Sequence, residues 1–278
     1  MKGSVPEGFC GLRAVRWNRK KRGNALTDFS KEYRMKYDFH THTVYSHGFP
    51  IPHGKGTVES NVAAAEKAGL EAIAIADHGF GHMFYGIRRG LVASERAEIE
   101  AAQAAHPSVR VYMSVEANII EIGDNLDLTH EEAGQFDFLI AGFHYGAWNC
   151  HGVSNWLCDK HITTPRLRER LRDRNTAMII GALRNYDIKI LTHPGDKCPV
   201  DMAAIAKVCA ETDTLMELNT SHLHLTVEEL KIAAKEDVRF IIGSDAHTSD
   251  RVGDYVNGLE RAEAAGVDFQ RIVNIEKR

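Results

Sequence analysis

The chain has 278 residues, 44% of them hydrophobic and 26% charged, which is the ordinary balance of a soluble globular domain. Its formal charge of −4 argues against a protein that binds nucleic acid over its whole surface. No apolar run approaches about 18 residues, so the composition excludes a transmembrane helix and a membrane partner, and the length suits one barrel domain.

Cysteine usage and the start of the chain predict a location. The five cysteines, Cys10, Cys150, Cys158, Cys198 and Cys209, are widely spaced and include no CxxC pair. An odd number at such spacing favours free thiols in a reducing compartment. The first residues also lack the apolar core of a secretory signal. We therefore expect a cytoplasmic protein.

Residues 1–34 show no periodicity and hold a basic run at residues 19–22. A short charge run of this kind is typical of a solvated surface arm, and contact with an anionic substrate or a partner subunit is the alternative. We interpret residues 1–34 as an N-terminal extension and residues 35–278 as a single barrel domain.

From residue 35 onward, apolar strands alternate with amphipathic helices. Strands are predicted over residues 35–40, 72–76, 109–115, 136–143, 188–191, 215–218 and 238–242. Helices are predicted over residues 58–68, 94–105, 165–185, 200–212, 226–235 and 250–265, the first between an N-cap at Thr57 and a stop at Gly69. This order predicts an α/β fold, a distorted (β/α)7 TIM-like barrel, with an open doubly wound sheet as the alternative.

Side chains that bind metals stand at or just after the ends of six predicted strands. In chain order they are His40 and His42, His78, Glu116, His144, His193, and Asp245 with His247. Imidazole and carboxylate are the ligands that a borderline divalent metal takes from protein, and barrel chemistry sits at the carboxyl ends of the strands. Burying so many ionisable groups without a cation would cost several kcal/mol each, so the pattern predicts a metal cluster.

Strand alternation indicates which of these side chains face one pocket. His40 and His42 are two residues apart and share a face, as do Asp245 and His247. Asp38 shares the face of His40, so we expect its carboxylate to orient that imidazole.

A Gly/Pro-rich loop between the first barrel strand and the helix at Thr57 contains His47 and His53, and either could supply another ligand. The loop leads to a helix N-terminus, where backbone N–H groups favour an anion such as phosphate.

Basic loop residues at the same end of the barrel are candidates for substrate binding, because guanidinium and ammonium groups match phosphate oxygens. They are Lys55, Arg88, Arg89 and Lys197, with exposed surface charge as the alternative for each. His222 follows the strand at 215–218 and is a candidate for protonating the leaving group.

Six motifs occur together in the chain: His40-Thr41-His42, Asp77-His78-Gly79, Glu116-Ala117-Asn118, Gly142-Phe143-His144, His193-Pro194-Gly195 and Gly243-Ser244-Asp245-Ala246-His247. In kind and order they resemble those of the polymerase and histidinol phosphatase (PHP) superfamily, over roughly residues 35–275. The chain looks closest to the stand-alone bacterial phosphoesterases of that superfamily.

The resemblance implies a centre of three divalent ions, usually zinc and sometimes manganese or iron. One ion would take His40, His42, Glu116 and Asp245, and Glu116 would bridge to a second ion that also takes His78 and His144. A third ion would take His193, His247 and a histidine of the first loop.

Two counts identify different loop histidines. Counting forward from His42 selects His47, whereas counting back from Thr57 selects His53, because residues 48–52 look like an insertion. We favour His53 and retain His47.

The predicted function is hydrolysis of a small phosphomonoester through a metal-bridged hydroxide, with Glu116 and Asp245 as the catalytic carboxylates. A PHP-type nuclease or phosphodiesterase and a non-catalytic metal-binding protein are the alternatives, although the acidic balance makes nucleic acid an unexpected partner. A metal-dependent amidohydrolase is disfavoured, because His144 stands where that class needs a bridging lysine.

Overall fold

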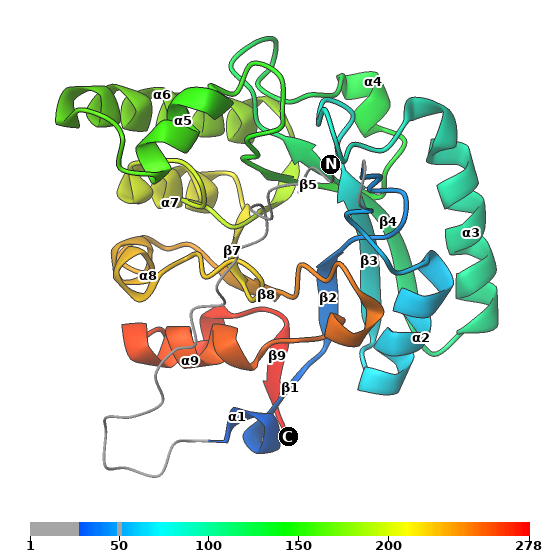
Figure 1. The fold of residues 1–278 in the computed structure, drawn as a ribbon. Helices are drawn as coiled ribbons and strands as arrows, with labels where there is room; N and C mark the ends of the chain where they lie inside the picture. The colour runs from blue at the N-terminus through cyan, green and yellow to red at the C-terminus, as the bar shows by residue number, and fades with distance from the viewer. Residues whose placement is uncertain (1–27, 49–51) are drawn as a thin grey trace, which may run out of the picture.

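The computed structural model describes residues 28–48 and 52–278. In this part of the chain, seven strands form one parallel sheet in chain order: β2 (Tyr37–Thr41), β3 (Ala72–His78), β4 (Arg110–Asn118), β5 (Phe138–Gly142), β6 (Ile188–Leu191), β7 (Leu215–Asn219) and β8 (Phe240–Gly243). Helices surround the strands, with α2 and α3 on one side and α6 to α9 on the other (Figure 1). The prediction of a distorted seven-stranded α/β barrel is confirmed.

The helices cross from one strand to the next outside the sheet. They are α2 (Val58–Ala68), α3 (Val92–Ala105), α4 (His130–Ala133), α5 (Gly152–Asp159), α6 (Pro165–Asn185), α7 (Met202–Glu211), α8 (Val227–Ala233) and α9 (Val256–Ala265). The predicted limits of α2 hold because the Thr57 side chain accepts from the Ser60 N–H and Gly69 ends the helix with a φ of 74°. No helix of the described residues is long and apolar enough to cross a membrane.

Two apolar layers lie on opposite faces of the sheet. One is the large core between strands and helices, and the other is a small cluster of Ala76, Ile140, Ile190 and Ile241. By strand alternation, Ala76 shares its face with His78, and Ile241 shares its face with Asp245. The small cluster therefore fills the barrel interior below the polar residues at the carboxyl ends of the strands.

Two predicted elements are wrong in detail. The strand expected at residues 35–40 is split, because β1 (Tyr33–Met35) pairs antiparallel with β9 (Ile275–Lys277) and only β2 enters the barrel. The helix expected at residues 250–265 is instead a 3₁₀ turn (Ser249–Arg251) followed by α9, because Gly253 adopts a φ of 79° between them.

The structure adds α5, in a segment for which no helix was predicted, and α1 (Phe29–Glu32) within the predicted extension. Together, α1 and the start of β1 occupy residues 29–34, whereas the basic run at 19–22 lies outside the described residues. The division between an extension and a barrel domain stays a prediction.

The barrel closes between β2 and the chain that follows β8. Thr41 and Ala246 form a parallel bridge, and the His42 N–H donates to the Ala246 carbonyl at 2.8 Å. Deeper in the barrel, Asn274 joins the same two strands. Its Nδ2 donates to the carbonyls of Tyr37 (2.9 Å) and Ile242 (2.7 Å), and its Oδ1 accepts from the Ile242 N–H at 3.0 Å.

We expect Asn274→Ala to lower the free energy of unfolding by about 3 kcal/mol, because it leaves buried backbone groups of β2 and β8 without partners. Urea titration followed by circular dichroism measures this change. Asn185→Ala is the control, since Asn185 is exposed and donates to a single carbonyl. Equal stability of the two variants would contradict a closing role for Asn274.

Candidate metal centre

Four imidazoles, each from a different segment, lie around the Glu116 carboxylate near the end of β4. Its carboxylate is fully buried. Oε1 lies 2.8 Å from His193 Nε2 and 3.4 Å from His40 Nε2, and Oε2 lies 3.0 Å from His78 Nδ1 and 3.4 Å from His144 Nε2. The predicted convergence of these strand ends is thus present in the fold.

Asp245 forms a second focus just after β8. Its Oδ1 lies 3.2 Å from His42 Nε2, 3.4 Å from His247 Nδ1 and 3.7 Å from His40 Nε2. The backbone of Asp245 is left-handed, with a φ of 49°, and this conformation turns the chain into the barrel mouth. His40 therefore lies between the two carboxylates.

The structure brings His53 beside this cluster. Its Nε2 lies 2.8 Å from His247 Nε2, and its ring stacks on Tyr85 with centroids 3.8 Å apart. His47 instead lines a neighbouring cavity of about 720 Å³ together with His82 and Phe80. Counting back from Thr57 selected His53, and His53 is the loop histidine whose ring nitrogen lies beside a cluster residue, His247.

Three groups among the described residues have ligand atoms close enough to hold one ion each. They are His40 with His42 and Asp245, His78 with Glu116 and His144, and His42 with His78 and His247. The first two groups follow the arrangement that the resemblance implied. His193 has its ring neighbours on the other side, in His40, His144 and His222, so the structure groups it with Glu116 rather than with His53.

The donor atoms fit divalent cations. Both ring nitrogens of His78 and Oε2 of Glu116 are buried without a hydrogen-bond partner, and His78 Nδ1 lies 3.0 Å from that Oε2. In addition, Nε2 of His40 and Nε2 of His42 face each other at 3.2 Å. Unpartnered lone pairs aimed into one buried space are costly unless a cation binds them.

The electrostatics favour cation binding as well. Burial opposes ionisation of Glu116 and Asp245, yet nearby imidazoles, led by His144 and His40 respectively, hold both carboxyl pKa values well below their usual range. Burial lowers the pKa of His247 to about 4 and that of His53 to about 2. At neutral pH these groups are carboxylates and neutral imidazoles, the forms that ligate metals.

Glu217, in β7, holds the His40 ring, and this corrects the expectation for Asp38. Glu217 Oε1 accepts from His40 Nδ1 at 2.7 Å, whereas Asp38 accepts from the backbone N–H groups of Ser244 (3.2 Å) and Gly253 (2.9 Å). The sequence did contain a signal for Glu217, because a carboxylate inside the apolar run 215–218 needs a buried partner.

Asn118 was a candidate for contact with substrate in the sequence, but its contact with His144 was not predicted. Its Oδ1 accepts from His144 Nδ1 at 2.8 Å, and its Nδ2 donates to Asp127. This bond leaves His144 Nε2 as the nitrogen that faces Glu116. Asn118 follows Glu116 by two residues, so strand alternation could have placed it on the same face.

His82 is a second missed group. Its Nδ1 accepts from the Tyr85 N–H at 3.0 Å, and burial lowers its pKa to about 3. The ring is therefore neutral and carries its proton on Nε2, and it stacks against His78. No periodic pattern marks this loop, so only the nearby Asp77-His78 motif pointed to it.

The predicted substrate residues lie at the mouth of the barrel. Lys197 Nζ pairs with Asp196 at 2.8 Å, and Arg89 pairs with Glu132 while its guanidinium lies over a phenylalanine ring. Arg88 is exposed and lines the cavity that contains His47, and Lys55 is exposed.

His222 lies between two carboxylates at the edge of the cluster. Its Nε2 is 3.4 Å from Asp245 Oδ2 and its Nδ1 is 3.3 Å from Asp196 Oδ2. Burial, followed by the nearby Lys197, lowers its pKa to about 4. The ring is therefore mostly neutral at pH 7.

Comparison with known families identifies the chain. The model of the PHP domain matches residues 38–221. The chain belongs to the PHP domain family. The resemblance drawn from the motifs is thereby confirmed.

Relatives match this PHP-domain protein over most of its length. It is 24% identical to a probable phosphatase of Shewanella pealeana, over 86% of this chain and 89% of the relative. It is 27% identical to a probable phosphatase of Acetivibrio thermocellus (86% and 92%) and 28% identical to one of Thermoanaerobacter sp. (87% and 91%).

The fold also has a solved counterpart. The structure resembles histidinol phosphate phosphatase from Lactococcus lactis subsp. lactis with a TM-score of 0.52 and 15% identity, covering 84% of this chain and 93% of the other. That protein was crystallised with zinc, L-histidinol and phosphate. At this identity the likeness establishes the barrel fold.

We expect Glu217→Gln to weaken zinc binding by about tenfold or more, because Glu217 accepts from His40 with one oxygen and from the His193 N–H with the other, whereas the amide keeps one acceptor and the His40 ring loses its fixed orientation. Competition with a chromophoric chelator measures the affinity. Glu211→Gln, on the exposed end of α7, is the control. Unchanged zinc affinity in a folded Glu217→Gln protein would contradict the orienting role.

The two loop histidines can be separated directly. His53→Ala should lower the number of ions bound per chain, because its Nε2 faces His247, whereas His47→Ala should leave that number unchanged. Inductively coupled plasma mass spectrometry of the dialysed proteins gives the count. The reverse result would assign the ligand to His47.

Proposed function

We propose that this protein is a metal-dependent phosphatase that hydrolyses a small phosphomonoester at a centre of three divalent ions. The coarser statement, a hydrolase acting on phosphoester bonds, rests on membership of the PHP domain family and on the probable phosphatases that match nearly its full length. The observation that carries the finer statement is the convergence of imidazoles on Glu116 and Asp245.

Three overlapping ligand groups support a centre of more than one ion. Because His42 and His78 each belong to two groups, the ions would lie next to one another rather than at separate sites. Zinc is the favoured metal, since the donors are imidazoles with carboxylates and the structurally similar histidinol phosphate phosphatase was crystallised with zinc. Manganese and iron accept the same donors.

Bound ions would supply two effects: they lower the pKa of a water molecule and neutralise charge on phosphate oxygens. The ligand residues of this chain would fix where those effects act. Glu116 and Asp245 are proposed as the carboxylates that would be shared between neighbouring ions. Glu217 holds the His40 ring in place.

The edge of the cluster offers groups for the substrate. Lys197 is proposed to bind a phosphate oxygen, since its ammonium group lies beside Asp196 and His222 at the mouth. We propose that His222 donates from Nδ1 to Asp196 and accepts, through its unprotonated Nε2, a hydrogen bond from a water molecule beside the leaving oxygen. A mostly neutral ring is suited to orienting that water, which then supplies the proton to the leaving oxygen.

The size of the surrounding space supports a small substrate. The cavities beside the cluster have volumes of about 570 and 720 Å³, within the range of small-molecule sites. A path for a nucleic-acid strand would need a long basic groove, and Arg89 is already paired with the Glu132 carboxylate.

Phosphate release from a panel of phosphomonoesters, measured on protein of known metal content, tests the proposal. We expect release to rise with metal occupancy and to stop with a chelator. Asp245→Ala should lose bound metal and lower turnover by more than about a hundredfold, because it removes a proposed ligand rather than a residue that orients one.

Asp187→Ala serves as the matched control, because Asp187 is exposed and pairs only with Lys189. An Asp245→Ala protein with full metal content and full activity would overturn the site assignment. Metal-loaded wild-type protein that releases no phosphate from any phosphomonoester would overturn the phosphatase proposal.

A further inference from the structure

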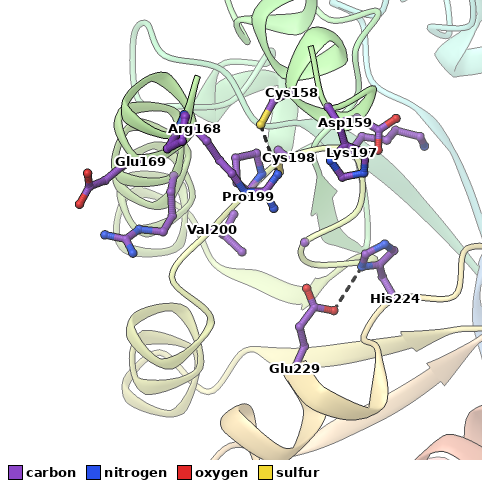
Figure 2. Close-up of a pocket in the computed structure, with 14 residues that line it drawn as sticks. Cys158, Asp159, Arg168, Glu169, Lys197, Cys198, Pro199, Val200, His224 and Glu229 are labelled. Atoms are coloured by element: carbon purple, nitrogen blue, oxygen red, sulfur yellow. Dashed lines mark hydrogen bonds and ion pairs between the residues drawn. The ribbon is translucent and has the colours of Figure 1, made fainter. Parts of the chain in front are cut away.

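A second cavity, separate from the one that contains His47, lies near the cluster, between the start of α6 and the loops after β6 and β7 (Figure 2). We call it the α6 pocket and define it by Arg168, Lys197, Cys198, His224 and Glu229. Its volume is about 570 Å³, which is enough for a small organic group.

One layer of side chains separates this pocket from the metal ligands. His222 contacts Asp245 at 3.4 Å through Nε2 and Asp196 at 3.3 Å through Nδ1. Asp196 in turn contacts Lys197 at 2.8 Å and His224 at 3.7 Å, and both of these line the pocket. Because Lys197, the proposed phosphate contact, itself lines the α6 pocket, a phosphoester bound to Lys197 would place its alcohol portion beside that pocket.

The acidic side chains of the pocket are already engaged or turned away. Glu229 accepts from the backbone and hydroxyl of Thr226 and lies 3.3 Å from His224. Asp159 pairs with Lys160 at 2.8 Å. Figure 2 shows the Glu169 carboxylate on the side of α6 that faces away from His224.

Arg168 is the unengaged cation of the pocket. Its side chain reaches from α6 toward Cys158, and Nη1 donates to the Cys158 Sγ at 3.6 Å (Figure 2). Within the described chain it forms no ion pair with a carboxylate, whereas Lys197 pairs with Asp196 and Arg172 pairs with Asp173. A thiol is a weak acceptor, so most of the guanidinium donors of Arg168 remain free for an anion.

We infer that Arg168 determines specificity by binding a second anionic group of the substrate. The substrate class is then a phosphomonoester whose alcohol portion also carries a carboxylate or a second phosphate. This inference rests on the proposed phosphatase function and deepens it, since Arg168 touches the part of the substrate that is not hydrolysed. Because Arg168 is exposed to solvent, we expect an effect of about tenfold rather than a larger one.

Two matched substrate pairs test the inference and separate the two anions. Glycerol 3-phosphate is compared with 3-phosphoglycerate, and fructose 6-phosphate with fructose 1,6-bisphosphate. The metal-loaded full chain should favour the second member of at least one pair by about tenfold in kcat/KM. Preference in the first pair identifies a carboxylate, and preference in the second pair identifies a phosphate.

The variant Arg168→Gln should reduce that preference toward one, mainly through KM, because the lost contact binds substrate and transition state equally. Arg170→Gln is the matched control, since Arg170 lies on the same helix and does not line the pocket. Wild-type ratios near one in both pairs, or a preference that survives Arg168→Gln, would overturn the inference and leave the phosphatase proposal standing.

Direct binding keeps the inference testable if none of the four compounds is hydrolysed. Calorimetry then compares 3-phosphoglycerate and fructose 1,6-bisphosphate on wild-type and Arg168→Gln protein. Affinity for either compound that falls about tenfold in the variant supports the subsite independently of the phosphatase proposal, which the wider panel of phosphomonoesters tests. Equal affinity for both proteins overturns the subsite.

Discussion

A carboxylate excluded from water at the end of a central strand, Glu116, is the constraint on which the rest of the site depends. Imidazoles on both sides of β4 hold the pKa of this carboxyl well below its usual range despite burial. His78 and Glu116 are register partners of β3 and β4. A slip of one residue would turn either side chain to the helix-packed face, so strand register and site geometry are fixed by the same pairing.

Around this centre, carboxylates that touch no imidazole hold the loops. Asp77 accepts from the backbone N–H groups of Thr43 (2.8 Å) and Ser46 (3.0 Å), and thereby shapes the loop after β2. Asp127 does the same for Gly81 at 2.6 Å. Small residues keep the interior open, because a Cβ at Gly243 would collide with the Glu217 carboxylate. The ligand side chains are thus held before any ion binds, which lowers the entropy cost of binding one.

The strand pattern was enough to predict the barrel and the convergence of histidines, because both follow from period two and from parallel order. Depth along a strand was harder to predict. Asp38 does share a face with His40, but two residues span roughly 6.6 Å, so its carboxylate meets the backbone at Ser244 instead of the imidazole. Glu217 was hidden inside an apolar run, and the loop at His53 has no period that fixes its side chains.

The proposed division of roles, with phosphate at the metal cluster and the alcohol portion at the α6 pocket, follows from the chemistry of phosphomonoesters. Every phosphomonoester presents the same group to the metal ligands, so contacts at Glu116 and Asp245 cannot distinguish one alcohol from another. Discrimination must come from loops that leave the strand ends in place. The α6 pocket meets this requirement, because Arg168 stands on a helix outside the barrel and changes there leave the β3–β4 register untouched. Because the metal ligands lie at the strand ends and the pocket residues lie on surrounding helices and loops, one barrel can keep its hydrolytic geometry while its substrate changes.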